Sequence, residues 1–165
     1  MVLVANQQKT KGTQFESGCV NYLHANALID VARVPLHGRA DNGDLEMTVH
    51  GHRITAECKC VERVSDALLA KFRLQATVES QNAGTDGAVL LQWRHGCGYR
   101  WAESANSYRA KSFGGNLAHM TVETLLMVVG ATGEIQMHEL AAQTWVTIPI
   151  AEFALLARDW GSDGN

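Results

Sequence analysis

Alternation of apolar and polar residues predicts a β-hairpin in the first third of the chain. Residues 45–50 (LEMTVH) alternate strictly, Gly51-His52 is typical of a tight turn, and a return strand fits residues 53–60 (RITAECKC). Side chains two positions apart on a strand lie on the same face of a sheet. On the return strand the apolar positions would face the core, while Glu57 and Lys59 would share the opposite face.

The remaining periodicities predict helices and strands that follow one another along the chain. Three helices are expected: from Thr13, with Glu16 completing a capping box, to about residue 27; from 66 to about 81, capped by Ser65; and from Pro149 to Trp160. Strands are expected over 29–34, 88–94 and 145–148. Residues 121–129 fit either a helix or a strand, and residues 99–119 are left unassigned. This order indicates an α/β fold in layers.

Length and composition fit one domain with a hydrophobic core. The 165 residues are 46% hydrophobic, and we expect residues 1–12 to form a flexible tail ahead of a single domain over 13–165. The first residues lack a signal-peptide pattern, and the longest apolar run, residues 125–129, is too short to cross a membrane. We therefore expect a cytoplasmic protein without a membrane segment.

Charge and reactive residues narrow the classes of function. The net charge is −3, and 13 of the 14 Lys and Arg lie in residues 1–111 against 11 acids, so charge alone does not indicate nucleic-acid binding. The four cysteines include no C-x-x-C pair, and the histidines show no metalloprotease spacing, so we interpret the cysteines as reduced hydrophobic residues. No glycine motif suited to phosphates is present, and no nucleotide cofactor is expected.

The charged face of the hairpin is the candidate for chemistry. Asp44 opens the first strand, and the turn brings it alongside Glu57 and Lys59 on the second. Two carboxylates suit Mg²⁺, which prefers oxygen ligands and takes one or two protein carboxylates. A lysine beside the metal can orient or deprotonate a water molecule. The alternative is a solvated strand face with an ordinary Glu–Lys pair.

The spacing of these residues resembles a nuclease signature. Gly43-Asp44, followed thirteen residues after the aspartate by Glu57-Cys58-Lys59, looks like the PD-(D/E)-x-K motif, with Gly43 in place of the family's proline. The upstream helix at 13–16 and the lead-in over 35–41 add to the match, which covers residues 12 to about 95. Together they are similar to archaeal Holliday-junction resolvases and to RecB-like nucleases and resolvases of bacteriophages. The resemblance implies a restriction-endonuclease-like core with a central mixed β-sheet flanked by helices.

The resemblance also implies the ligands of a metal site. Asp44, Glu57 and the backbone carbonyl of Cys58 would bind one or two Mg²⁺ or Mn²⁺ ions, and Lys59 would position the attacking water. Glu16 would approach the same cluster from the first helix, as the family's early glutamate does. Its role in the capping box is the alternative, and the two are compatible.

Further residues would support catalysis or DNA binding. Gln75 is similar to a glutamine that RecB-like nucleases carry near the metal, with a structural role as the alternative. Four residues could contact DNA phosphates, with a solvated position as the alternative for those on the loop: Arg33, His37 and Arg39 before the hairpin, and Lys71 one turn before Gln75. Asp41 could supply a spare carboxylate or form a turn, and the turn is the favoured interpretation.

The function that the resemblance implies is a metal-dependent, structure-selective DNA endonuclease. A Holliday-junction resolvase acting on branched DNA as a homodimer is the leading expectation. A RecB-like exonuclease acting on single strands or ends is the first alternative. The second is a catalytically inactive binding module on the same fold. A phage-encoded enzyme of this kind would act in the host cytoplasm.

Overall fold

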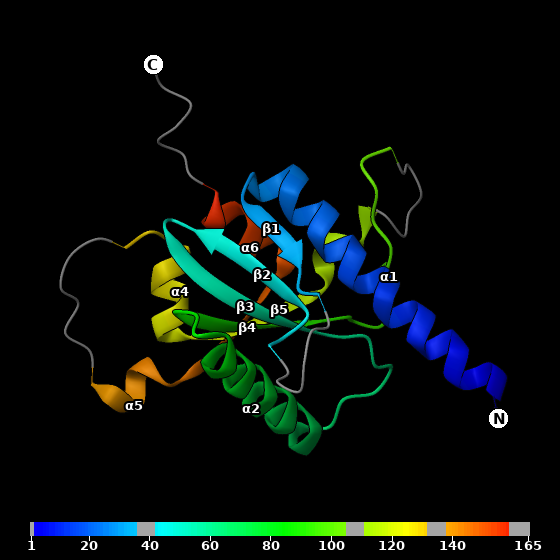
Figure 1. Ribbon diagram of the computed structural model, residues 1–165, viewed down its shortest axis with the longest axis horizontal. Coiled ribbons are helices and arrows are strands. Elements are labelled where there is room, and N and C mark those ends of the chain that lie inside the picture. Colours follow the sequence, from blue (N-terminus) through cyan, green and yellow to red (C-terminus); the bar gives the residue numbers. More distant parts are fainter. Residues whose placement is uncertain (1, 36–41, 105–110, 132–137, 159–165) are drawn as a thin grey trace.

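Helices and strands alternate along the chain in the computed structural model, which describes residues 2–35, 42–104, 111–131 and 138–158 (Figure 1). In chain order the elements are α1 (Val2–Ala27), β1 (Asp30–Arg33), β2 (Leu45–Val49), β3 (His52–Lys59), α2 (Asp66–Ala83), β4 (Gly87–Gln92), the 3-10 turn η1 (Phe113–Gly115), β5 (Leu117–Thr121), α4 (Val122–Val128), α5 (Glu139–Ala142), β6 (Trp145–Pro149) and α6 (Ile150–Ala157).

The six described strands form one mixed sheet in the order β1-β2-β3-β4-β5-β6. Neighbouring strands are antiparallel except β3 and β4, which run parallel and are connected through α2. A parallel connection needs a crossover of a dozen residues or more, and α2 supplies it. The expectation of an α/β fold with a mixed sheet flanked by helices is confirmed at this level.

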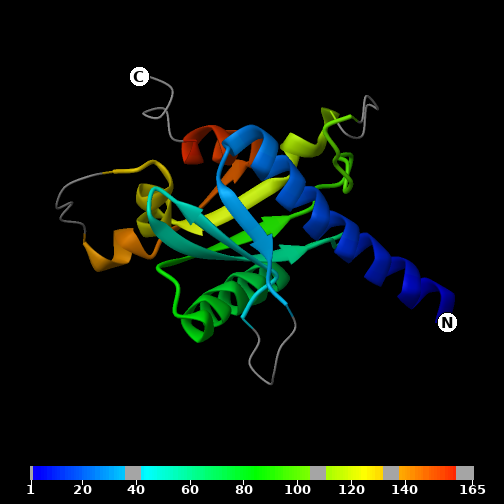
Figure 2. The same ribbon diagram turned by 45° about the horizontal axis from the view of Figure 1, so that its top comes forward.

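Helices cover both faces of the sheet. Figure 2 shows α2 beneath the sheet, with α1 and α6 above it. The main core lies on the side of α1 and α6, and a smaller cluster around Phe72, Ala76 and Leu90 lies under α2. β4 is apolar on both faces, as expected for a central strand, since Val89, Leu90 and Leu91 are all buried.

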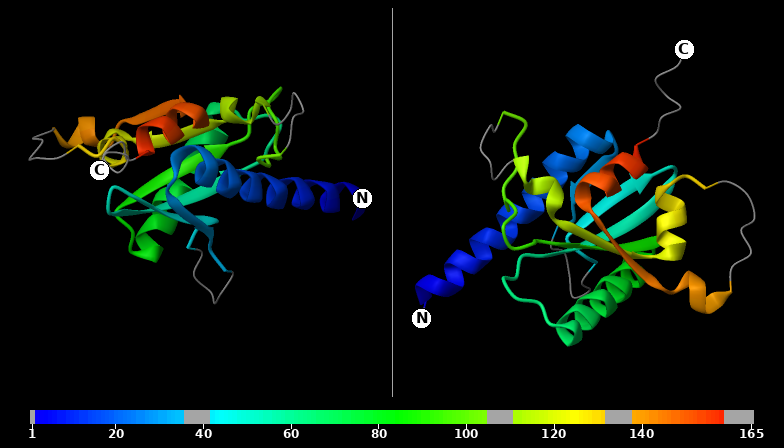
Figure 3. Two further views of the ribbon diagram at one scale, coloured as in Figure 1. Left: turned by 90° about the horizontal axis from the view of Figure 1, so that it is seen from above. Right: turned by 180° about the vertical axis from the view of Figure 1, so that it is seen from behind.

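The first helix begins much earlier than the sequence predicted. α1 starts at Val2, so Thr13 and Glu16 lie in its interior, and the interpretation of these two residues as an N-terminal capping box is wrong. The segment expected to be a loose tail is helical. Residues 6–11 (NQQKTK) contain Gln and Lys, which favour helices, and this preference outweighs the cost of Gly12. The N-terminal turns of α1 extend beyond the sheet in Figures 1 and 3.

Most of the other predicted elements are confirmed near their expected bounds. Ser65 caps α2 by accepting a hydrogen bond from the Leu68 N–H at 3.3 Å. The hairpin turn lies at His50-Gly51, one residue earlier than expected, and both residues have positive φ, as a type I′ turn requires. The expected strands over 29–34, 88–94 and 145–148 correspond to β1, β4 and β6.

The C-terminal third contains the differences. Residues 122–128 form a helix, α4, because the Thr121 hydroxyl accepts from the Thr124 N–H at 3.2 Å and caps it. The unassigned region 99–119 holds η1 and the start of β5. α6 ends at Ala157, short of the predicted Trp160, which lies outside the described residues. In the described part of the chain, none of the helices has an apolar stretch sufficient for a membrane span.

Candidate metal centre

Hydrogen bonds hold Asp44, just before β2, against β3 beside Glu57. Leu45 at the start of β2 pairs with Ala56 of β3, and the Asp44 N–H donates to the Ala56 carbonyl at 3.0 Å. One Asp44 carboxylate oxygen, Oδ2, accepts a hydrogen bond of 2.8 Å from the Cys58 N–H. Leu45 and Ala56 are buried in the main core, so Glu57 faces α2, and a side-chain hydrogen bond brings the Asp44 and Glu57 carboxyls together. The predicted proximity of these two carboxylates is present in the structure.

A backbone requirement explains why glycine precedes Asp44. Gly43 has φ of +84°, a conformation that the ring of proline excludes. A Cβ at this position would lie 2.4 Å from Cγ2 of Thr55, which is much too close. The departure from the family's proline therefore has a local cause, the tight approach of this turn to β3.

Lys59 lies two residues beyond Glu57 and on the same face of β3. Its ammonium forms an ion pair with Oε1 of Glu57, and the lysine side chain retains 19% of its exposure. The ammonium also lies 5.3 Å from the centre of the Phe72 ring on α2. Contact with both a carboxylate and an aromatic ring holds the charge in a defined place at the edge of the site.

Gln75 lies on α2 and connects Glu57 of the hairpin with a second glutamate, Glu79, on the same helix. Its side-chain Nε2 donates to Oε1 of Glu57 at 3.1 Å and to Oε1 of Glu79 at 2.7 Å. Gln75 and Glu79 lie one turn apart on α2, where such side chains meet. Gln75 therefore lies beside Glu57 in the candidate site.

Glu79 is a site residue that the sequence reasoning missed. It is only 2% exposed, and a hydrogen bond between it and Glu57 favours the protonated form of Glu57. The signal was available in the sequence, because Glu79 lies seven residues after Phe72 and thus on the buried stripe of α2. A carboxylate on a buried stripe seldom occurs without a polar partner.

Burial raises the pKa values of both hairpin carboxyls, and neighbouring acidic side chains add to the rise. Loss of solvation raises the pKa of Asp44 to about 7, the negative charges of Glu57 and Glu16 add to the rise, and the Cys58 N–H opposes it. Burial likewise raises the pKa of Glu57 to about 7, aided by Glu79 and opposed by Lys59. Perturbed carboxyl groups that lie together are typical of functional sites.

Glu16 approaches the cluster from α1, which covers the face of the sheet opposite α2. It forms an ion pair with Arg33 at the end of β1, and its charge acts on both Asp44 and the Cys58 thiol. Arg33, expected to contact phosphate, is therefore paired with Glu16, although 48% of its side chain is exposed. The structure brings both residues to the edge of the carboxylate cluster.

The backbone carbonyl of Cys58 points toward Asp44. The Cys58 N–H donates to Asp44, whereas the carbonyl of the next residue, Lys59, accepts from the Trp93 N–H on the side of β4. Successive peptide groups alternate in direction along a strand, so the Cys58 carbonyl faces the β2 side. Its thiol lies on the opposite face, near Cys19, and burial raises its pKa. All four cysteines are free.

The remaining predicted DNA contacts are placed only in part. Lys71 is exposed on α2, one turn before Gln75. His37 and Arg39 lie outside the described residues, as does Asp41.

The donor set fits a hard divalent cation. In the part of the chain that the structure describes, no three His, Cys, Asp or Glu side chains form a ready-made metal cluster. Mg²⁺ does not need one, because it takes one or two carboxylates and fills its other positions with water and substrate oxygens. Asp44, Glu57 and the Cys58 carbonyl provide such a set. A cation between the two carboxylates would also relieve their repulsion.

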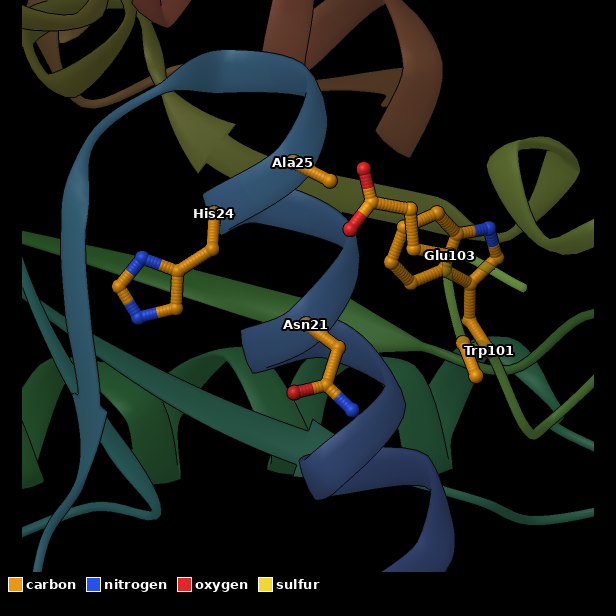
Figure 4. A pocket seen from close by; sticks show the side chains of 6 residues that line it. Asn21, His24, Ala25, Trp101 and Glu103 are labelled. Carbon is orange, nitrogen blue, oxygen red and sulfur yellow. The ribbon is translucent and has the colours of Figure 1, made fainter. Parts of the chain in front are cut away.

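Two hollows are found elsewhere on the described surface. One, of about 360 Å³, lies between α1 and the segment 101–103 and is lined by Asn21, His24 and Trp101, among others; Figure 4 shows Glu103 directed toward Ala25 across it. Another, of about 260 Å³, lies along β1 and the start of β2. Neither includes Asp44, Glu57 or Lys59, and we assign chemistry to the cluster because charged groups converge there.

Comparison with known proteins adds no family. No protein-family model, curated protein or solved structure matches this chain. Any functional conclusion therefore depends on the geometry above and on the resemblance of the motif.

Replacing Glu79 with glutamine should lower the pKa of Glu57 from about 7 toward the ordinary carboxyl range. The substitution removes a negative charge beside Glu57 and preserves an acceptor for the amide of Gln75. Carboxyl carbon NMR titration of the metal-free protein measures this directly. Glu62, an exposed glutamate, provides the matched control, since Glu62→Gln should leave the titration of Glu57 in place. An unchanged titration in Glu79→Gln would contradict the coupling.

Proposed function

We propose that this chain is a metal-dependent deoxyribonuclease that hydrolyses phosphodiester bonds. The observation that carries the proposal is the convergence of Asp44, Glu57 and Lys59 at the open end of the β2–β3 hairpin. The buried carboxylates with raised pKa values and the amide of Gln75 support it further.

The order of elements supports a restriction-endonuclease-like core for residues 2–92. A first helix that carries Glu16 leads to a hairpin whose return strand carries E-x-K, and a helix and a parallel strand follow. This is the arrangement that the resemblance implies. β5 and β6 extend the sheet beyond this core.

Each charged group has a chemical role in the proposed reaction. Asp44, Glu57 and the Cys58 carbonyl would hold Mg²⁺ or Mn²⁺, which when bound polarises a phosphate and lowers the pKa of water. The Lys59 ammonium, fixed by Glu57 and by the Phe72 ring, orients the attacking water and offsets negative charge that develops on the phosphate. Gln75 fixes the carboxylate of Glu57, which keeps its oxygens aligned.

Two kinds of substrate follow from the resemblance. A junction resolvase would work as a symmetric dimer on branched DNA, so that two sites meet two strands. A RecB-like nuclease would act on single strands or ends. The contact of Gln75 with Glu57 favours the RecB-like candidate, because the glutamine belongs to that part of the resemblance.

Cleavage should require Mg²⁺ or Mn²⁺ and should stop in EDTA. Ca²⁺ should support DNA binding with little or no cutting, because it binds oxygen ligands with looser geometry. The measurement uses a labelled four-way junction, a linear duplex and a single strand, each incubated with the full chain and each metal. Paired symmetric nicks near the crossover indicate a resolvase, and a ladder from the ends indicates an exonuclease.

The same assay separates an enzyme from an inactive binding module. DNA binding without cutting in either Mg²⁺ or Mn²⁺ would identify a module and overturn the proposal. Rapid cutting in EDTA would overturn the metal site. A preparation of Glu57→Gln tests for contaminating nucleases, because any activity that survives in it does not come from this site.

A further inference from the structure

A group of aromatic and basic side chains lies on the α1 side of the sheet, where β3 and β4 end, and is used by none of the steps above. This group, here called the Trp93 platform, consists of Lys11 from α1 and four residues from the segment after β4: Trp93, His95, Tyr99 and Arg100. The rings of Trp93 and Tyr99 are half-buried, whereas His95 and both cations are exposed. The platform therefore presents aromatic edges and positive charge to solvent.

Ring contacts hold the two cations in place. The Lys11 ammonium lies 5.9 Å from the centre of the Trp93 ring and 5.6 Å from that of Tyr99. The Arg100 guanidinium lies 5.5 Å from the Tyr99 ring, and its Nε donates to Oε1 of Gln14 at 2.8 Å. Such cation–π contacts position a positive charge without neutralising it.

The rings are fixed relative to one another. Trp93 meets Tyr99 edge to face at 6.5 Å between ring centres, and His95 lies 6.1 Å from Trp93. The Trp93 indole N–H donates to the Cys97 carbonyl at 2.9 Å. Gly18 lets the segment that carries Trp101 and Phe113 pack closely against α1. A Cβ at this position would lie 2.8 Å from the Phe113 ring and 3.2 Å from the Trp101 backbone nitrogen. The segment after β4 accordingly runs beside the middle of α1 in Figures 1 and 2.

A backbone contact joins the platform to the strand that carries the candidate site. The Trp93 N–H donates to the carbonyl of Lys59 at 2.9 Å. The platform therefore begins beside the end of β3 that carries Lys59, and a strand of nucleic acid that passes around this end of the sheet would reach the residues proposed to hydrolyse it.

The positive charges of Lys11 and Arg100 are available to bind a ligand. Among the described residues, the ion pairs join Glu16 to Arg33, Asp86 to His52, Glu46 to Arg53 and Glu57 to Lys59, and none involves Lys11 or Arg100. Exposed cations next to half-buried rings suit phosphates and unpaired bases respectively. Duplex DNA offers the phosphates but keeps its bases stacked.

We infer that the Trp93 platform binds a single-stranded segment of DNA and delivers it to the carboxylate cluster. This inference rests on the proposed function and specifies its substrate: a strand with unpaired bases, either free or at a branch. Unpaired bases contact the exposed parts of the Trp93, His95 and Tyr99 rings, while Lys11 and Arg100 contact the phosphates.

The test is binding of labelled oligo(dT) and of a duplex hairpin of equal length, measured by fluorescence anisotropy in EDTA with the full chain. The wild-type protein should bind oligo(dT) more tightly than the duplex. Tyr99→Leu should weaken oligo(dT) binding by at least about fivefold, whereas Tyr99→Phe should retain it. The double variant Lys11→Ala/Arg100→Ala should reduce the slope of log K against log salt by about 1.4, because each lost phosphate contact on a single strand is worth about 0.7.

The control is Arg53→Ala, which removes one positive charge at the opposite end of β3 and should leave binding unchanged. Equal affinity for the two DNAs, or variants that bind as the wild type does, would overturn the platform. If the wild-type protein binds oligo(dT) as expected but shows no metal-dependent cleavage, only the nuclease proposal is overturned. Cleavage that depends on Glu57 but is indifferent to Lys11 and Tyr99 on every substrate would overturn only the platform.

Discussion

Replacing Lys59 with methionine should reduce metal-dependent DNA cleavage by about 10²- to 10⁴-fold while leaving DNA binding nearly intact. Methionine keeps most of the length of the side chain and can pack on Phe72, but it removes the ammonium that contacts Glu57. The loss should appear in the rate of single-turnover cleavage, since the ammonium is proposed to act on the attacking water and the transition state. Binding is measured separately in Ca²⁺.

Two further variants define the role of the charge. Lys59→Arg keeps a positive charge with a different shape and should recover little activity, because a planar guanidinium cannot replace a compact ammonium in a fixed place. Arg53→Met, also on β3 but at its start and outside the site, should cleave as the wild type does. Wild-type cleavage rates in Lys59→Met would remove this residue from the proposed chemistry.

Glu57→Gln should stabilise the metal-free protein at pH 7 by about 1–2 kcal/mol while abolishing cleavage. Burial of Glu57, which is 4% exposed, raises its pKa to about 7, so the ionised carboxylate opposes folding. Glutamine keeps the shape and accepts the hydrogen bond from Gln75, although Lys59 loses its partner. The stabilisation corresponds to an increase in Tm of about 2–8 °C in EDTA.

The pH dependence has a definite sign. The pKa of Glu57 is about 7 in the folded protein, against an ordinary value of 4.5 for this carboxyl. Between these values the folded state binds more protons than the unfolded state, so the stability that this group contributes is full below pH 4.5 and is lost as the pH rises through 7. Urea unfolding at several pH values in EDTA should show a stabilisation by Glu57→Gln that grows from pH 5 to pH 8.

An exposed glutamate serves as the control for this effect. Glu46→Gln, on the neighbouring strand, should leave stability nearly unchanged, because the Glu46 side chain is 40% exposed and pairs with Arg53 at the surface. A Glu57→Gln variant that is less stable than the wild type at pH 8 in EDTA would contradict the proposed cost of the buried charge. Addition of Mg²⁺ should narrow the difference by stabilising the wild type.

Local sequence patterns were sufficient to predict the hairpin and α2, because the structural preferences of a few neighbouring residues there match the structure that they adopt in the fold. Strict alternation in β2 and the Ser65 cap of α2 are signals that a few residues carry by themselves. Period-two alternation also predicted that Glu57 and Lys59 share a face. The proximity of Asp44 to these residues followed from the two-residue turn, because so short a turn fixes the register of the two strands that it joins.

The N-terminal boundary of α1 was misjudged because a local capping signal competed with helix propensity. Thr13 and Glu16 have the spacing of a capping box, yet Thr13 lies in a continuous helix and Glu16 pairs with Arg33. The contact with Arg33 crosses from α1 to β1, and no local pattern specifies it. A capping box therefore marks a helix start only when the preceding residues do not favour helix themselves.

Long-range contacts account for the other omissions. Glu79 belongs to the site because the crossover through α2 lays its buried stripe against β3, which the helical period alone does not reveal. Residues 99–119 lack a repeating pattern, so β5 could be recognised only from its pairing with β4 and β6. The Trp93 platform likewise joins α1 to the segment after β4, far apart in sequence.

The last two strands protect an edge of the sheet. Every residue of the proposed catalytic cluster lies before β4, yet β4 is apolar on both faces and is hydrogen-bonded along one side to β5. A chain truncated after Trp93 would leave β4 as a bare edge strand, which is a template for aggregation, and would remove α6 from the main core and Tyr99 and Arg100 from the platform. Such a fragment should accumulate in inclusion bodies, so an active version of this protein needs the segment from β5 to α6.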